Sequence, residues 1–206
     1  MSYKPETLEN ILLRFPEPAR DEIMSLFGQH QFLFRITSPR QTRLGSFRAA
    51  HNGGRPAISV NIDLGEYMFL LVFLHELSHL IVWKQYRRSV SPHGNEWKTT
   101  YRNLATRFLA QNVFPPELAL ELGRYFVKTP ATFHHNIRLV NILASLEGRS
   151  NIVTVNDVPL NGTFTLINGR QFVKIERLRT RFKCYCPADR KYYLVSKSAE
   201  IIIPEK

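Results

Sequence analysis

The segment from Asp63 to Arg88 constrains the fold more than any other part of the chain. Asp63 is a residue type that caps helices, and Glu66 follows three residues later, as in a capping box. The apolar run Tyr67–Leu74 then leads into the residues HELSH, and it is too short and too polar at its end to span a membrane. We therefore expect one buried helix that carries two histidines and a glutamate.

The spacing within HELSH predicts a metal site on this helix. Residues four apart lie on one helix face, about 6 Å apart along the axis, so His75 and His79 can both direct an imidazole at one ion. Glu76 falls beside that face, where its carboxylate can reach a metal-bound water without binding the metal. A zinc ion would lower the pKa of that water, and Glu76 would accept its proton as the catalytic base. A chance match on a core helix is the plainer alternative, and it is on the order of a one per cent event.

A catalytic zinc takes three protein ligands, and His93 is the predicted third. A helix from His79 to Arg88 is about 14 Å long, and the extended residues 89–93 can return about 16 Å, so the chain can bring His93 back to the metal. Glu96 and His51 remain alternatives for this ligand. The adjacent pair His134 and His135 is a weaker candidate, because neighbouring side chains diverge.

The rest of the chain predicts an α+β fold of two parts. Apolar spacing and turn residues predict helices over 7–15, 17–29, 94–111 and 116–128, and short strands over 32–36, 43–50 and 57–62 that form a small antiparallel sheet. From about Ser150 the sequence alternates β-forming residues with turns, and Asn168-Gly169 is a hairpin signal. We expect a core over 1–148 and a basic β-rich module over 149–206.

The formal charge of +11, from 28 basic and 17 acidic residues, favours a polyanionic partner such as DNA. Arg177, Arg179 and Arg181 alternate with other residues, so on a strand they would share one face and could follow phosphates, while Tyr185, Tyr192 or Tyr193 could stack on bases. A solvated strand face is the simpler alternative. The predicted nucleic-acid contacts are Arg177, Arg179, Arg181, Arg87 and Arg88.

The residues HELSHLIVWK followed by SPHGNEWK resemble the SprT-like zinc metalloprotease family, which includes the Spartan-type proteases. The resemblance covers roughly Leu44 to Phe108 and implies a zincin-like core in which His75, His79 and His93 bind zinc and Glu76 is the base. Spartan-type members degrade proteins crosslinked to DNA, and the family often carries a zinc ribbon after the protease core. Only Cys184 and Cys186 stand where such a ribbon needs four cysteines, so the module is expected to be a degenerate ribbon whose core takes the place of the metal. The residues expected to form that core are Phe164, Leu166, Phe172, Val173, Ile175 and Leu194.

These observations favour a zinc-dependent metalloprotease that acts on a protein substrate, with DNA as a partner and without membrane insertion. The alternatives are a non-proteolytic zinc-containing DNA-binding or transcription-associated protein, and a hydrolase of other amide bonds. Tyr101 and Tyr125 are candidates for stabilising the oxyanion, whereas Trp83 and Trp97 are expected to pack in the core. No secretion signal opens the sequence, so a cytoplasmic location is expected.

Overall fold

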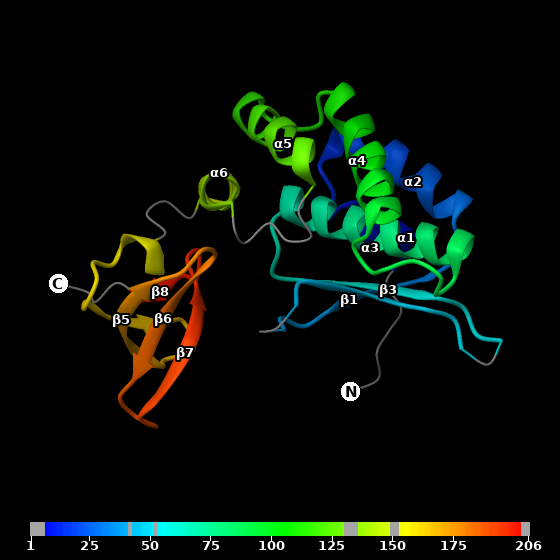
Figure 1. Ribbon diagram of the computed structural model, residues 1–206. Coiled ribbons are helices and arrows are strands. Elements are labelled where there is room, and N and C mark those ends of the chain that lie inside the picture. Colours follow the sequence, from blue (N-terminus) through cyan, green and yellow to red (C-terminus); the bar gives the residue numbers. More distant parts are fainter. Residues whose placement is uncertain (1–6, 41–42, 52, 130–135, 149–152, 203–206) are drawn as a thin grey trace. The chain divides into compact units, whose positions relative to one another are not determined.

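The computed structural model describes residues 7–40, 43–51, 53–129, 136–148 and 153–202. The chain divides into two compact units, Met1–Ala131 and Thr132–Lys206. The predicted boundary after residue 148 falls next to residues outside the described ranges, and it stays a prediction. The α+β class expected from the sequence is confirmed, since each unit has its own sheet (Figure 1). His134 and His135 lie outside the described residues.

The first unit contains a three-stranded sheet of order β1-β3-β2. β1 (Leu33–Thr37) pairs with β3 (Ala57–Asn61) in parallel, and β2 (Gly45–Arg48) pairs with β3 in antiparallel orientation. The sheet is therefore mixed, and the expectation of an antiparallel sheet is wrong. The segment between β1 and β2 carries the chain past the central position, which β3 then fills between the two earlier strands.

Helices cover one face of this sheet (Figure 1). The longest is α3 (Glu66–Tyr86), and it packs on β2 and β3 and against α4 (Asn95–Ala110). By length and composition α3 could cross a membrane, but 61% of its most apolar window is buried within the fold. The remaining helical elements of this unit are α1 (Leu8–Leu12), η1 (Glu17–Ala19), α2 (Arg20–Gln29) and α5 (Pro116–Lys128).

The start of α3 differs from the sequence expectation. The helix is capped by Gly65, and the capping box expected from Asp63 does not form. The Arg14 guanidinium donates hydrogen bonds to the carbonyl oxygens of Ile62 and Leu64, so these carbonyls are engaged outside the helix. The loop after β3 is thereby held in a turn, and the helix begins at Glu66.

The second unit contains α6 (Ile137–Leu146), which the sequence analysis missed, and a five-stranded sheet of order β7-β6-β5-β4-β8. The predicted hairpin at Asn168-Gly169 is confirmed, because it joins β4 to β5 and Gly169 has φ +80°. Its other elements are η3 (Val155–Asp157), β4 (Thr163–Leu166), β5 (Gln171–Arg177), β6 (Arg181–Cys186), β7 (Lys191–Ser196) and β8 (Ile201–Ile202).

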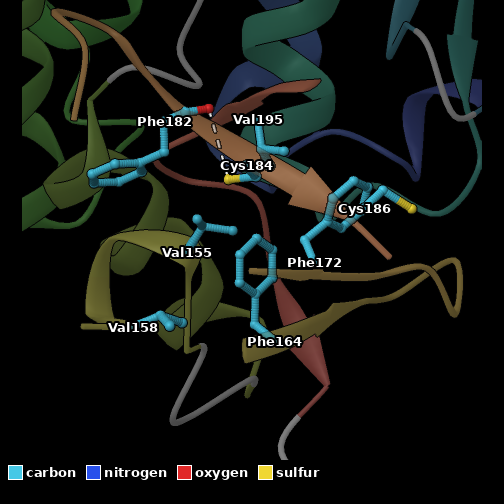
Figure 2. Packing of buried hydrophobic residues seen from close by; sticks show 8 residues of the cluster. All are labelled: Val155, Val158, Phe164, Phe172, Phe182, Cys184, Cys186 and Val195. Atoms are coloured by element: carbon cyan, nitrogen blue, oxygen red, sulfur yellow. Dashed lines mark hydrogen bonds between the residues drawn. The ribbon is translucent and has the colours of Figure 1, made fainter. Parts of the chain in front are cut away.

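The buried residues of the second unit differ in part from the predicted core residues (Figure 2). Phe164 and Phe172 are buried as expected and Leu166 packs beside them, but Ile175 is 38% and Leu194 is 54% exposed, and Val173 is only half-buried. Val173 and Ile175 alternate on β5 with the buried Phe172 and Lys174, and Leu194 alternates on β7 with Val195, so these apolar residues face outward. The other members of the buried cluster are Val155, Val158, Phe182, Cys184, Cys186 and Val195.

A buried lysine completes this core. Lys174 is 4% exposed, and its ammonium donates hydrogen bonds to the carbonyl oxygens of Val155, Asn156 and Val158 while lying 3.7 Å from the centre of the Phe182 ring. The positive charge thus fixes η3 to the sheet. Cys184 and Cys186 are both free thiols within the apolar cluster.

Candidate metal centre

Three imidazoles converge on one point above α3. The Nε2 atoms of His75 and His79 are 3.3 Å apart, those of His79 and His93 are 3.0 Å apart, and those of His93 and His75 are 3.2 Å apart. All three residues are half-buried. Among the described residues, His75, His79 and His93 form a group whose ligand atoms could hold a metal ion. Sequence spacing and structure therefore bring the same three side chains together.

The donor set fits a tetrahedral metal. Zinc–imidazole bonds of about 2.0–2.1 Å at tetrahedral angles place neighbouring nitrogens about 3.3–3.4 Å apart, close to the observed triangle. Burial lowers the pKa of His75 to about 3 and of His79 to about 4, with neighbouring imidazoles adding to the effect, and burial also lowers the pKa of His93. Neutral imidazoles with converging nitrogens are the form in which histidine binds metals.

A tight turn delivers His93. The amide of Gly94 donates to the Ser91 carbonyl oxygen at 3.0 Å, with Pro92 second in the turn and His93 third at φ 58°. Proline at the second position and a left-handed third residue are typical of a type II turn. A Cβ on Gly94 would lie 2.9 Å from the Ser91 oxygen, so glycine is needed where the turn enters α4.

Trp97 forms the floor of the site. Its ring centre lies 4.6 Å from that of His75, 5.4 Å from His79 and 4.6 Å from His93, and its indole N–H donates to the His75 carbonyl oxygen at 3.3 Å. Trp97 is 1% exposed, so the expected core role is correct. The sequence analysis missed that this core position supports all three imidazoles; its place four residues after His93, in the first turn of α4, was the available signal.

The side chain of Glu76 extends from α3 toward the edge strand β2. Its carboxylate accepts a hydrogen bond from the Phe47 amide, and the Phe47 ring stacks on His79 with centres 6.4 Å apart. Burial raises the pKa of Glu76 to about 7, although the Phe47 amide, Arg40 and Arg43 oppose that rise. A buried carboxyl group whose pKa lies near neutrality is suited to proton transfer.

Gly45 leaves the space that Glu76 occupies. A Cβ at this position would lie 2.6 Å from Cγ1 of Val72 and 2.9 Å from both Cγ and Oε1 of Glu76. Sequence reasoning missed this residue, because the close approach joins a strand to a helix more than twenty residues later. Glycine here permits the helix to pack closely against β2.

The other candidates occupy different places. Glu96 and His51 do not belong to the group of converging ligand atoms found within the described ranges. Tyr101 is fully buried and its hydroxyl donates to the Leu71 carbonyl oxygen at 3.3 Å, while its ring packs 5.7 Å from that of His75. Burial raises the pKa of both Tyr101 and Tyr125. The buried position of Tyr101 fits a supporting role for α3.

The predicted arginine stripe is not a strand face. Arg177 ends β5, Arg181 begins β6, and Arg179 lies in the turn between them, where the Leu178 amide bonds to the Arg181 carbonyl oxygen. The chain reverses within the alternating stretch, so the three exposed side chains lie at the end of a hairpin. Near the end of α3, Arg87 lies 4.6 Å from the Trp83 ring, and Arg88 is exposed.

A helix with two histidines four residues apart and a third histidine from the following turn form a group that could hold a metal ion, in an α+β unit with a small mixed sheet. Residues 30–118 match the model of the SprT-like family, so the resemblance read from the sequence is confirmed over this part of the chain. The family points in general to metalloprotease-type proteins that use zinc. A search of curated proteins and a search of solved structures gave no significant match.

Proposed function

We propose that this protein is a zinc-dependent metallopeptidase with a zincin-like core. The observation that carries the proposal is the triangle of Nε2 atoms, 3.0–3.3 Å apart, beside a glutamate on the same helix. His75, His79 and His93 would hold the ion. Zinc bound there would act as a Lewis acid that acidifies water and polarises a carbonyl group.

The proton in the proposed reaction passes through Glu76. Glu76 follows directly after His75 on α3, and its carboxylate would accept a proton from the attacking water. The Phe47 amide holds the carboxylate in place, and Gly45 leaves room for it. The same carboxyl group can then donate the proton to the amine that leaves when the peptide bond breaks.

An edge strand beside the site supports a peptide as substrate. β2 is at the edge of the sheet, and Phe47 on this strand contacts both Glu76 and His79. An extended peptide can pair with an exposed edge strand through main-chain hydrogen bonds. Pairing at β2 would bring a peptide bond close to the histidines without requiring a particular side chain.

DNA is the proposed partner of the second unit. The outward face of its sheet carries Tyr185 and Tyr192 with ring centres 5.3 Å apart, and the Lys183 ammonium lies 4.9 Å from the Tyr192 ring centre. Tyr192 is 60% exposed, so its ring is accessible to an unpaired base. The hairpin arginines Arg177, Arg179 and Arg181 would contact phosphates, and the substrates would then be DNA-bound proteins.

Cleavage of an unfolded protein such as casein, with and without single-stranded DNA, tests this function. We expect fragments from the wild type and none from Glu76→Gln at equal zinc content, because the amide cannot accept the proton. DNA is expected to raise the wild-type rate. Equal activity of wild type and Glu76→Gln would refute the proposed role, and zinc retained without any cleavage would favour the non-proteolytic alternative.

A further inference from the structure

The sheet of the first unit has a second face, opposite the side on which α3 packs. Phe34, Ile58 and Phe47 point toward the helices, since Phe34 packs on Phe73 and Phe47 on His79, and Ile58 is fully buried. Residues that alternate with them therefore point away from α3. Figure 1 shows the helices of this unit on one side of the sheet.

Within the described part of the first unit, the helices leave this second face free, and we call it the uncovered face; it carries arginines and small polar side chains beside Leu33 and Ala57. The register aligns Arg35, Ser59 and Ser46 in one row across β1, β3 and β2, and Arg48 lies opposite Ala57 in the neighbouring row. Arg35 and Arg48 are exposed. Two strand spacings separate β1 from β2 by about 10 Å, and the two arginines are also one row apart along the strands, so they would reach different phosphates.

Arg40 lies along the same face. Its guanidinium donates from Nε to Asn61 at 2.8 Å and from Nη1 to the hydroxyl of Ser59 at 3.1 Å and of Ser46 at 3.4 Å. The third nitrogen, Nη2, is buried and has no hydrogen-bond partner. An acceptor oxygen from a bound anion would satisfy this donor after a small movement of its neighbours.

The charge of this segment has one sign. Between Glu22 and Asp63 the sequence contains five arginines and no acidic residue. Within the described parts of the chain, no carboxylate forms an ion pair with the arginines of the uncovered face. The basic residues of this segment are arginines, and the guanidinium group is suited to bidentate contacts with phosphate.

We propose that this uncovered face, defined by Arg35, Arg40 and Arg48 with the hydroxyls of Ser46 and Ser59, binds the phosphate backbone of nucleic acid. It has no aromatic side chain to stack on bases, so the contacts are independent of sequence and a duplex is accepted. The peptidase unit would thereby contact nucleic acid itself, in addition to the second unit. This inference does not depend on hydrolysis, because its readout is binding.

Anisotropy of a labelled DNA duplex, titrated with the full chain at several salt concentrations, tests the proposal. Arg35→Gln/Arg48→Gln is expected to reduce the slope of log K against log salt by about 1.8 and to weaken binding roughly 10- to 60-fold at 0.1 M salt, as counterion release predicts for two lost contacts. Arg35→Lys/Arg48→Lys is expected to restore most of the slope, which excludes misfolding as the cause.

Lys84→Gln/Lys128→Gln is the matched control, because it removes two exposed charges from helices of the same unit. It is expected to keep the wild-type slope. An identical slope and affinity for the Gln pair and this control would overturn the proposal. The proposal would also be overturned if Arg35→Gln/Arg48→Gln lost binding to anionic phospholipid vesicles while its DNA binding stayed unchanged. The face would then recognise a membrane surface.

Discussion

Gly45→Ala is the most informative single substitution near the metal centre, because it alters the position of Glu76 without removing a catalytic group or a ligand. The new methyl carbon would lie 2.6 Å from Val72 and 2.9 Å from Glu76. Ordinary carbon contacts begin at about 3.5 Å, so the helix and β2 must separate, or the carboxylate must move, by several tenths of an ångström to almost 1 Å. Val72 is 4% exposed and has little freedom to yield.

The expected result is a large loss of activity with modest loss of stability. A displacement of this size at a catalytic group lowers kcat/KM by up to about 100-fold, and overpacking costs about 1–3 kcal/mol in the free energy of unfolding. Zinc content should stay at the wild-type level, because the atoms nearest to the new methyl carbon belong to Val72 and Glu76 rather than to the histidines. The assay combines kcat/KM for casein cleavage, metal analysis and chemical unfolding.

Gly123→Ala is the matched control. Gly123 lies in α5 and a Cβ there would meet nothing within 4 Å, so this substitution should leave kcat/KM unchanged and slightly stabilise the helix. Full activity of Gly45→Ala in a folded, zinc-loaded protein would refute the reasoning that the close approach at Gly45 positions Glu76.

Three further outcomes are expected. Trp97→Phe removes the hydrogen bond to the His75 carbonyl oxygen, and should weaken zinc affinity about 10- to 100-fold in chelator competition; unchanged affinity would contradict a supporting role. The free energy of unfolding of the metal-free protein should decrease as the pH falls from about 6.5 toward 4. His75 and His79, with pKa values of about 3 and about 4 in the folded chain, stay neutral there but bind protons in the unfolded chain. A free energy of unfolding that does not change over that pH range would contradict this prediction. Lys174→Met leaves three carbonyl oxygens without their donor and should lower the free energy of unfolding of the second unit by roughly 2–3 kcal/mol, measured against Lys191→Met; equal stability of the two variants would contradict it.

Local patterns predicted the helix and the converging histidines. His75 and His79 follow from helical periodicity, and chain length alone allows His93 to return to them. The structure brings all three Nε2 atoms together, and their role as zinc ligands stays a prediction. Such inferences succeed because they depend on residues close together in the chain.

Local sequence patterns could not predict contacts between segments that are far apart in the chain. Gly45 and Glu76 meet only because β2 packs on α3, and the support from Trp97 depends on how α4 crosses α3. Ile175 was expected in the core as an apolar residue, but it alternates on β5 with the buried Phe172 and Lys174 and therefore lies on the surface. The prediction that three arginines share a strand face was wrong because a turn in the middle of the alternating stretch ends the strand.

The zinc content of the purified protein tests the central claim most directly. Mass spectrometry of the metal in protein prepared without chelators should give about one zinc per chain for the wild type and Glu76→Gln. Each of His75→Ala, His79→Ala and His93→Ala should lose most of it. A wild-type protein without stoichiometric metal, or one zinc retained by all three histidine variants, would contradict the assignment of this triad as the metal centre.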